Sequence, residues 1–512
     1  MIRISVLSNI CFEPYLKKSF LRAFSGTADV SYTSLNDIGE ATVLDAELIL
    51  LHINLEDWLN SADMLQTEDI IVRCREMYNC IRNKTNAVIL FLGFEDYFSD
   101  CHYVYGNITP YNGIADRLNI DISEDIFDID NFIDLKRIIA GIGIEHSYSV
   151  KGKYRWNSPY SELLTDKIAD EVYKQYCIIT GQTKKCLVLD CDNVLWGGIL
   201  SEDGIEGIRL GNSGLGREYR DFQRFLQDLY FHGVILTVCS KNDEPDVRRV
   251  FREHSGMILR EEQVACFKIN WNSKPENIRA IADELNISTD SMVFVDDSVF
   301  ETEAVRALLP EVITIKYDRE RMYEKFACFN LRNNIDSFEV EARNRTYRTA
   351  PLRKALMEKC GSYDKYIESL DSRIDIHRIL PAEYSRVAEL TQRANRCTNG
   401  MRYTAVEIKR HAQEQVWFYT VSLSDRFSDL GIVGAIETED NVLRLFSLSC
   451  RALGRGVEEK MLRYIAAEHD IKTILFSDSG KNQSLFNLLN DIFPNAEFVC
   501  VDDGKCRSGD AK

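Results

Sequence analysis

Three short apolar runs in the middle of the chain, at residues 186–189, 234–238 and 292–295, most constrain its fold. Each run is followed by a cluster of polar residues and then by a helix-like stretch. This alternation of buried strands and helices predicts a parallel α/β sheet. Polar residues at the strand ends are then expected to meet at one edge of the sheet, where open parallel sheets place their chemistry.

The same alternation predicts further units on either side. Apolar strands are expected at 2–7, 46–51 and 87–92, with a helix at 15–24. A long helix is predicted to start with Ser158 as its N-terminal cap and Pro159 at its first position. The charge-rich region 316–373 is expected to be helical, the runs at 415–423, 431–437 and 441–449 to form adjacent antiparallel strands, and 457–468 to form a helix. We expect three domains, over residues 1–180, 181–330 and 331–512.

Composition limits the kinds of partner and the cellular compartment that we expect for the protein. Against 80 Asp and Glu the chain has 62 Lys and Arg, a net charge of −18, which argues against nucleic acid or an anionic membrane as the main partner. Its 15 cysteines form no CxxC pair or Cys/His cluster, so neither a disulfide framework nor a zinc site is indicated. No apolar stretch approaches the roughly 18 residues of a membrane span. We expect a cytoplasmic protein.

An Asp-x-Asp motif follows the first of the three central strands, in the segment 186–198 with sequence CLVLDCDNVLWGG. On an extended segment Asp190 and Asp192 would face the same side, and Mg²⁺ would relieve their repulsion. One carboxylate could attack phosphorus while the other protonates the leaving oxygen. The motif alone is weak, because turns after strands favour Asp.

The ends of the later strands carry further residues suited to phosphoryl transfer. Ser240 ends the second strand and could hold phosphoryl oxygens, and Lys274 offers a cation for the charge that develops on them. The pair Asp296 and Asp297 closes the third strand and supplies carboxylates for a magnesium site. The set predicts phosphoryl-transfer chemistry.

In order and spacing these motifs resemble the haloacid dehalogenase (HAD) superfamily. The resemblance implies a HAD-like Rossmannoid parallel sheet, with Asp190 as nucleophile and Asp192 as general acid and base. It implies phosphate binding by Ser240 and Lys274. It places Mg²⁺ among Asp190, Asp192 and the pair of Asp296 and Asp297, without deciding which of that pair contacts the ion.

The residues around the motifs are similar to those of the FkbH-like branch, HAD subfamily IIIC. The similar segments are KCLVLD at 185–190, LWGG at 195–198 and SKND at 240–243. Two departures are Val194, where the branch often has Thr, and Ser298-Val299, where an Asn-Pro is common. The resemblance implies an enzyme that dephosphorylates a small phosphorylated acid, 1,3-bisphosphoglycerate, and passes the glyceryl unit to an acyl carrier protein for polyketide or related secondary metabolism.

Thioester chemistry needs a thiolate on the enzyme or on the carrier. Cys191 lies between the two aspartates and Cys239 lies beside Ser240, so both are candidates. If the strands stay extended, these thiols point away from their neighbours, and a buried apolar cysteine is the commoner outcome.

Near the C-terminus the motif Arg451-x-x-Gly454-x-Gly456 joins an apolar strand to a helix. Glycines allow close backbone approach, and a helix N-terminus attracts an anion such as a pyrophosphate. The motif resembles the acyl-CoA loop of GNAT acetyltransferases, which implies an α+β domain that grips a carrier's phosphopantetheine arm or uses an acyl-CoA. Carrier docking would need a basic patch, for which Arg451 and Arg455 are candidates.

The N-terminal part resembles the SGNH-hydrolase-like α/β domain that precedes the phosphatase core in FkbH-like proteins. Ser8 ends the first strand, where such a hydrolase carries its serine, but no partner is readable and His146 is isolated. We expect this unit to be structural or partner-binding. The alternative for the whole chain is a phosphatase paired with an acyl-CoA N- or O-acyltransferase acting on a sugar or polysaccharide precursor.

Overall fold

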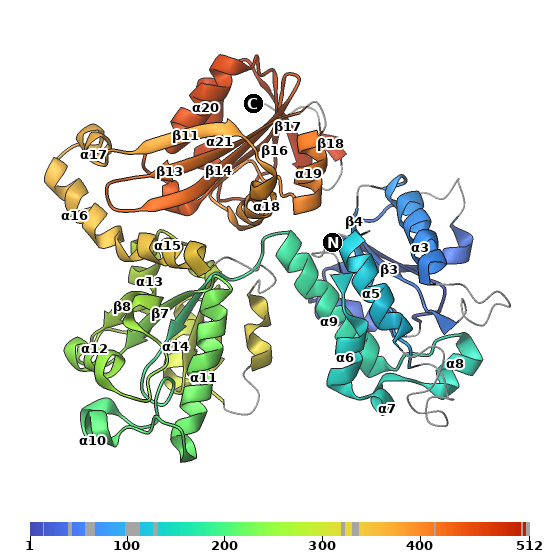
Figure 1. Cartoon of the computed structure of the whole chain (residues 1–512), viewed down its shortest axis with the longest axis horizontal. Coiled ribbons are helices and arrows are strands. Elements are labelled where there is room, and N and C mark those ends of the chain that lie inside the picture. The colour runs from blue at the N-terminus through green and yellow to red at the C-terminus, as the bar shows by residue number, and fades with distance from the viewer. Residues whose placement is uncertain are drawn as a thin grey trace. The chain divides into compact units, whose positions relative to one another are not determined.

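The computed structural model describes residues 1–13, 15–38, 44–56, 67–85, 87–97, 113–125, 132–318, 323–329, 337–413, 416–502 and 505–507 (Figure 1). One compact unit comprises residues 1–180 together with 501–507, and a second comprises residues 181–500. Among the described helices, none has the length and apolar character needed to cross a membrane.

The first unit is built on a parallel sheet in the order β2-β1-β3-β4-β5. Its strands are β1 (Ile2–Ser8), β2 (Ala28–Ser34), β3 (Leu48–His52), β4 (Val88–Leu92) and β5 (Phe132–Ile133). Its helices are α1 (Leu16–Ala23), α3 (Thr67–Arg82), α5 (Ile114–Asp125), α6 (Leu135–Ile142), α7 (Ile144–Ser147), α8 (Val150–Trp156) and α9 (Glu162–Ile179). Alternate strand residues face two separate cores, one with α1, α6 and α9 and the other with α3 and α5.

The start of α9 corrects one prediction. The helix begins at Glu162, and its cap is Ser161, whose hydroxyl accepts a hydrogen bond from the Leu164 amide at 3.2 Å. Pro159 therefore lies before the helix rather than at its first position. The reason is that Tyr160 is extended and bridges to Tyr148, which delays the helix until the next residue able to cap it.

The middle of the chain forms a second parallel sheet, in the order β10-β9-β6-β7-β8. Its strands are β6 (Cys186–Leu189), β7 (Ile235–Ser240), β8 (Val264–Ile269), β9 (Met292–Asp296) and β10 (Ile313–Lys316). Its helices are α10 (Leu200–Gly207), α11 (Gly214–Phe231), α12 (Glu244–Glu253), α13 (Lys274–Leu285) and α14 (Val299–Leu308). The predicted parallel α/β core is confirmed, and β8 and β10 are additions that the sequence did not predict.

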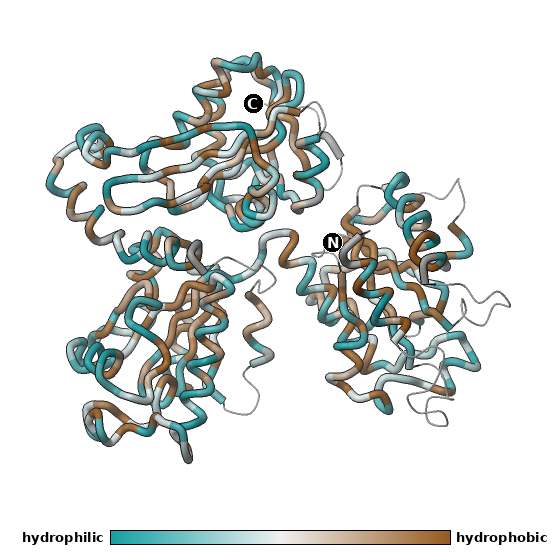
Figure 2. The backbone as a smooth tube through the Cα atoms, viewed as in Figure 1, coloured by the Kyte–Doolittle hydropathy of each residue, from teal (hydrophilic) through white to brown (hydrophobic). Residues whose placement is uncertain are grey.

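Both faces of this sheet are covered. Leu187 and Leu189 of β6 face a core shared with α11 and α12, whereas Cys186 and Val188 face a core shared with α13 and α14. This two-sided burial explains why the strands are continuous apolar runs rather than alternating ones. Figure 2 shows these strands as hydrophobic segments between helices of mixed character.

The remainder of the second unit carries a mixed sheet. Its strands run in the order β11-β13-β14-β15-β16-β17, with β12 beside β15. The strands are β11 (Arg373–Arg378), β12 (Cys397–Thr398), β13 (Trp417–Ser424), β14 (Asp429–Glu439), β15 (Val442–Leu448), β16 (Thr473–Phe476) and β17 (Glu497–Asp502). The last two residues of β17 and the strand β18 (Lys505–Arg507) belong to the first unit. The helices are α15 (Ser337–Arg348), α16 (Ala350–Cys360), α17 (Tyr363–Ser369), α18 (Tyr384–Arg393), α19 (Ala405–Gln413), α20 (Val457–Glu468) and α21 (Gln483–Ile492).

The predicted antiparallel strands β13, β14 and β15 and the predicted helix α20 are present. Gln415, placed in the first of those strands, lies outside the described residues. So do 319–322 and 330–336 of the region predicted to be helical from 316 to 373, in which α15, α16 and α17 are the described helices.

Candidate active site

Three carboxylates meet at one edge of the central sheet. Asp190 follows β6, Asp296 ends β9 and Asp297 follows it, and one oxygen of each lies within 4.8 Å of the others. They come together because β6 and β9 are neighbouring parallel strands that end at the same edge, with the Asp190 amide donating to the Val295 carbonyl at 3.0 Å. Acidic oxygens so close together fit a hard divalent cation.

Lys274 supplies a buried cation to the same cluster. Its Nζ donates to Asp190 Oδ1 at 2.6 Å and to the Cys239 carbonyl at 2.7 Å, and it lies 3.2 Å from Asp296 Oδ2. The side chain is only 2% exposed. Lys274 is the first residue of α13, and the Ser273 capping box fixes that helix start. The local sequence thus positions the ammonium over the end of the sheet.

The pKa values in the cluster show that it is short of positive charge. Burial, together with the nearby Asp190 charge, raises the pKa of Asp296 to about 7 even though Lys274 opposes the shift. Burial and Asp190 also raise the pKa of Asp297, against a hydrogen bond from Asn193. Burial acts to lower the pKa of Lys274, but Asp190 and Asp296 raise it overall. A bound cation would replace the proton that Asp296 otherwise retains.

Ser240 and Asn242 line the neighbouring strand end. Ser240 is the last residue of β7 and is almost fully buried. The Asn242 amide donates to Ser240 Oγ at 3.1 Å and to Asp192 Oδ2 at 2.9 Å. The Asn242 amide therefore links Ser240, the predicted phosphate-binding residue, to Asp192, the predicted general acid.

The structure does not place the Asp192 carboxylate in the three-carboxylate cluster, where the sequence placed it as a metal ligand. The strand ends at Leu189, and Asn193 has a left-handed φ of 55°, so the alternation of an extended strand does not reach Asp192. The Asp192 side chain instead accepts hydrogen bonds from Trp196 Nε1 at 2.9 Å and the Leu200 amide at 3.2 Å. Burial raises the pKa of Asp192 despite these donors, which suits a proton carrier.

The two candidate thiols are buried apolar cysteines. Cys191 and Cys239 are both fully inaccessible to solvent. Burial raises the pKa of Cys239 to about 12 and that of Cys191 well above its usual value. Because the thiolate is the nucleophilic form, neither side chain is set up as an acyl acceptor.

The glycines of the C-terminal loop are required by its backbone. Gly454 and Gly456 have φ values of 69° and 71°, the left-handed region that favours glycine, and a Cβ at either position would meet open space. The Gly454 amide donates to Glu458 Oε1 at 3.3 Å. Arg451, the third residue of this predicted site, is buried against a separate cavity described below.

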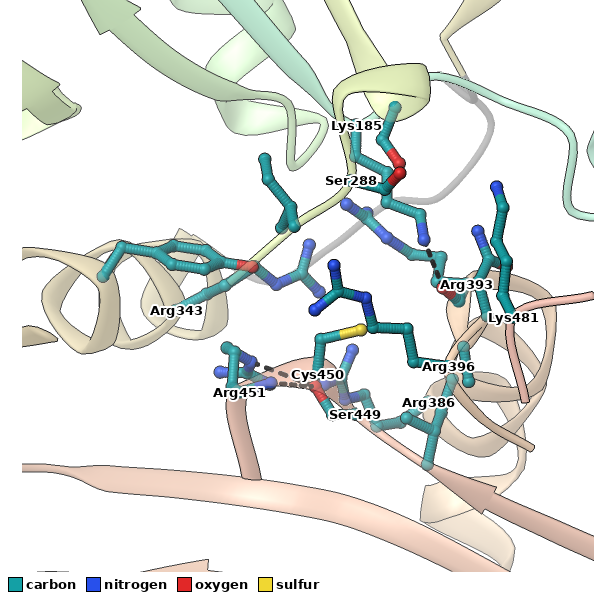
Figure 3. A pocket seen from close by; sticks show the side chains of 16 residues that line it. Lys185, Ser288, Arg343, Arg386, Arg393, Arg396, Ser449, Cys450, Arg451 and Lys481 are labelled. Atoms are coloured by element: carbon teal, nitrogen blue, oxygen red, sulfur yellow. Dashed lines mark hydrogen bonds between the residues drawn. The ribbon is translucent and has the colours of Figure 1, made fainter. Parts of the chain in front are cut away.

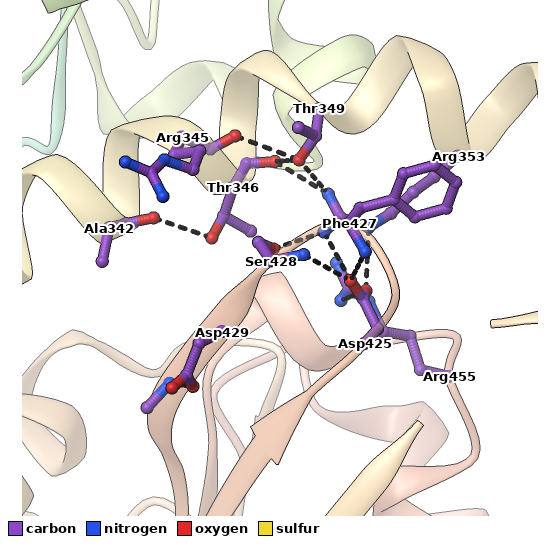
Figure 4. A network of polar contacts seen from close by, with 11 residues as sticks. Ala342, Arg345, Thr346, Thr349, Arg353, Asp425, Phe427, Ser428, Asp429 and Arg455 are labelled. Carbon is purple, nitrogen blue, oxygen red and sulfur yellow. Dashed lines mark hydrogen bonds and ion pairs between the residues drawn. The ribbon is translucent and has the colours of Figure 1, made fainter. Parts of the chain in front are cut away.

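Arg455 is held in a buried ion network rather than in an exposed basic patch (Figure 4). Its Nη1 donates to Asp425 Oδ2 at 2.7 Å, and Arg353 contacts both oxygens of the same carboxylate at 3.0 and 3.1 Å. The Asp425 carboxylate has no exposed surface. The use of Arg455 for carrier docking stays a prediction, and in this structure the charge is paired with Asp425 inside the fold.

Ser8 in the first unit has a partner that the sequence did not reveal. Its Oγ lies 2.8 Å from Nδ1 of His52, whose Nε2 lies 2.9 Å from the Tyr160 hydroxyl, and Tyr160 donates to Glu95 at 3.4 Å. The serine and histidine meet because Ser8 and His52 are opposite each other in the β1–β3 register. All four side chains are buried, so the network is enclosed rather than open to a substrate.

This network predicts an unusual pH dependence for the first unit. Burial lowers the pKa of His52 from 6.5 to about 3. Below pH 6.5 this histidine is therefore protonated in the unfolded chain before it is protonated in the folded protein, which favours unfolding. Burial raises the pKa of Glu95 to about 7 from 4.5, which has the opposite effect between 4.5 and 7. We expect stability to change little from pH 6.5 to 4.5 and to fall below pH 4.5. The measurement is Tm as a function of pH. His52→Gln should abolish the loss of Tm below pH 4.5, whereas His146→Gln, a change at an exposed histidine, should retain that loss. Identical pH profiles of Tm for the two variants would contradict this account.

No known family model matches this sequence, and no curated protein matches it. Among solved structures, the chain is similar to the N-terminal part of the protein BF1531 from Bacteroides fragilis, which contains a phosphatase domain complexed with Mg. The identity is 22%, the match covers 64% of this chain and 93% of that one, and the TM-score is 0.54. Over the matched part the two chains share a fold. A HAD family enzyme from Bacteroides thetaiotaomicron, solved as a magnesium complex, is 14% identical over 28% of this chain and 98% of its own, with a TM-score of 0.21.

The raised pKa of Asp296 makes a prediction about magnesium. In the metal-free protein the folded state keeps a proton that the unfolded chain releases between pH 3.8 and about 7, so stability falls as the pH rises through that window. Mg²⁺ bound to the three carboxylates would remove this penalty. We expect Mg²⁺ to raise Tm more at pH 8 than at pH 5, measured by thermal unfolding with and without the ion. A rise independent of pH, or one retained by Asp296→Asn with Asp297→Asn, would contradict the site.

Proposed function

We propose that this chain is a magnesium-dependent phosphatase of the HAD type that acts on a small phosphorylated acid. The observation that carries the proposal is the cluster of Asp190, Asp296 and Asp297 with the buried Lys274 at one sheet edge. The shared fold with the phosphatase-containing part of BF1531, which was solved with Mg, supports the reaction class and the metal. Asp190, Asp296 and Asp297 would hold Mg²⁺, which neutralises charge on the phosphoryl oxygens.

In the proposed reaction Asp190 attacks phosphorus, a bond forms between its carboxylate oxygen and phosphorus, and the bond from phosphorus to the leaving oxygen breaks. Asp192 gives that oxygen a proton, for which its raised pKa is suited. Water then attacks the phosphorus of the aspartyl-phosphate, Asp192 takes the water's proton, the bond from phosphorus to the Asp190 oxygen breaks, and inorganic phosphate leaves. Ser240 and Lys274 would hold the phosphoryl oxygens during both steps.

We further propose a more specific activity, the transfer of a glyceryl or other acyl unit to an acyl carrier protein, as the resemblance to FkbH-like proteins implies. The buried state of Cys191 and Cys239 favours the carrier's own thiolate as the acceptor. Its sulfur would attack the acyl carbon of 1,3-bisphosphoglycerate, and the carbon–oxygen bond to the acyl phosphate would break with release of that phosphate. The phosphate ester at the other end of the glyceryl unit would then be the group that Asp190 removes. The resemblance also underlies the proposed place in secondary metabolism.

Roles for the outer domains are proposals of the same kind. The antiparallel strands β13 to β15, followed by a glycine loop and α20, support a GNAT-like domain that holds the phosphopantetheine arm. The parallel sheet of the first unit supports an SGNH-like domain. Its enclosed Ser8 and His52 support a structural role rather than a hydrolytic one.

The test is incubation of the full chain with 1,3-bisphosphoglycerate, Mg²⁺ and a panel of acyl carrier proteins, followed by mass spectrometry of the carriers and assay of free phosphate. A glyceryl adduct that requires Asp190 supports the full proposal. Phosphate release without an adduct restricts the function to the phosphatase, and an acyl-CoA arm then tests acyl transfer to a sugar acceptor. No phosphate release from any phosphorylated acid tested would overturn the proposal.

A further inference from the structure

A small cavity lies at the opposite end of β6 from the carboxylate cluster (Figure 3). Lys185 precedes β6 and lines the cavity, whereas Asp190 follows β6 and belongs to the cluster. The other walls include α15, α18 with the residues that follow it, the loop after β15 and the segment before β9, and the cavity volume is ≈ 60 Å³. The cavity is therefore distinct from the proposed phosphatase centre.

The wall of this cavity is strongly basic. No acidic side chain is among the described residues that line it, whereas its basic residues include Lys185, Arg343, Arg386, Arg393, Arg396 and Arg451. As Figure 3 shows, these side chains approach the cavity from several elements of the fold, two of them, Arg386 and Arg393, from α18. Bringing so many cations together in a partly buried space is unfavourable unless anions compensate them.

The carboxylates around the cavity do not supply that compensation. Glu389 alone pairs with three of the arginines, accepting from Arg343 at 2.7 Å, from Arg393 at 3.1 Å and from Arg386. Lys481, also on the wall, pairs with Asp290. In the described part of the chain, no carboxylate forms a salt bridge with the three other cations, Lys185, Arg396 and Arg451.

Arg451 shows the imbalance most clearly. The residue is 9% exposed, and among the described residues its Nε donates to Ser449 Oγ alone, at a long 3.4 Å. Burial lowers the pKa of Arg451 to about 9, and the charges of Arg386 and Arg343 add to the effect. A guanidinium ordinarily stays charged inside proteins, so Arg451 places a buried positive charge beside Arg386 and Arg343, which line the same cavity.

The geometry suits one class of anion. Arginine forks bind tetrahedral oxyanions by charge-assisted hydrogen bonds, and phosphate carries enough charge to balance several of them. A water molecule needs roughly 10–15 Å³ of such space, so the cavity has room for the few atoms of a phosphate group but not for a nucleotide. We propose that this cavity binds a small phosphate-bearing anion, at a site separate from the three-carboxylate cluster.

This proposal does not rest on the proposed phosphatase function. The anion would link the start of β6 to the loop after β15, and so join two sheets of the second unit. Two sources share the required chemistry: free inorganic phosphate, and the phosphate head of an organic monoester. Their relative affinities distinguish the two sources.

The test is thermal unfolding of the full chain, titrated with inorganic phosphate and separately with sn-glycerol 3-phosphate in buffer containing EDTA and no other oxyanion. Phosphate should raise the Tm of the wild type. Arg451→Gln should weaken the apparent affinity about tenfold or more. The same substitution should leave Tm unchanged or raise it in anion-free buffer, because it removes an uncompensated buried charge.

The matched control is Arg463→Gln, which removes an arginine on α20 that is exposed and paired with Glu459; it should respond to phosphate as the wild type does. Lys185→Gln, on another wall of the cavity, should weaken binding as Arg451→Gln does. A tighter response to phosphate points to the free ion, and a tighter response to the monoester points to an organic ligand. Unchanged phosphate affinity in both Arg451→Gln and Lys185→Gln would overturn the proposal.

Discussion

Asp190→Asn is expected to lower phosphate release by about 10⁴-fold or more while the protein remains folded. The amide cannot form the aspartyl-phosphate, and it no longer offers Lys274 the charged oxygen that now lies 2.6 Å from Nζ. The measurement is steady-state phosphate release in saturating Mg²⁺, with circular dichroism and Tm to confirm that the fold persists.

The matched control is Asp283→Asn, the same chemical change on an exposed position of α13. It should retain wild-type turnover. If Asp190→Asn turned over at the control rate, Asp190 would not be the nucleophile. Because the carboxylate is lost rather than moved, raising the Mg²⁺ concentration should not rescue the variant.

Lys274→Met is expected to destabilise the second unit by about 3–5 kcal/mol in the absence of Mg²⁺ at pH 8. The ammonium is buried and pairs with Asp190 and Asp296, so its removal leaves two carboxylates facing each other without a cation. The loss should be smaller at pH 5, since Asp296 is protonated below its raised pKa of about 7. Mg²⁺ should restore part of the stability. Hydrogen exchange of peptides that cover β6 and β9 measures the effect within this unit.

Lys268→Met provides the comparison, because Lys268 pairs with Glu284 at 2.5 Å with both side chains about a quarter exposed. Removing a partly exposed pair of this kind should cost about 1 kcal/mol or less. Equal losses in the two lysine variants, or a Lys274→Met loss that does not depend on pH, would show that the buried cluster is not charged as described.

The sequence predicted the central strands well because they are buried on both faces. β6 has the predicted bounds, while β7 and β9 extend farther, to Ser240 and Asp296, because pairing with β8 and β10 continues into the polar ends. β8 and β10 were missed because lysine interrupts or ends the apolar run of each strand, at Lys268 and Lys316. An apolar run alone does not mark such strands.

The side-chain arrangement was less predictable, because it depends on turns and on sheet order. The position of Asp192 follows from the left-handed turn at Asn193, which a strand pattern does not reveal. His52 meets Ser8 only because β1 and β3 are neighbours. The basic cavity gathers Lys185 and Arg451, which are far apart in the sequence and come from different sheets. No local spacing signals such a site.

The most direct test of the central claim is a crystal structure of the full chain with Mg²⁺ and beryllium fluoride, a mimic of the aspartyl-phosphate. We predict beryllium fluoride bound to the Asp190 carboxylate, one Mg²⁺ held by Asp190 together with Asp296 or Asp297, and Lys274 beside the fluorides. Mg²⁺ bound elsewhere, or an Asp190 carboxylate that carries no adduct at saturating beryllium fluoride, would contradict the account.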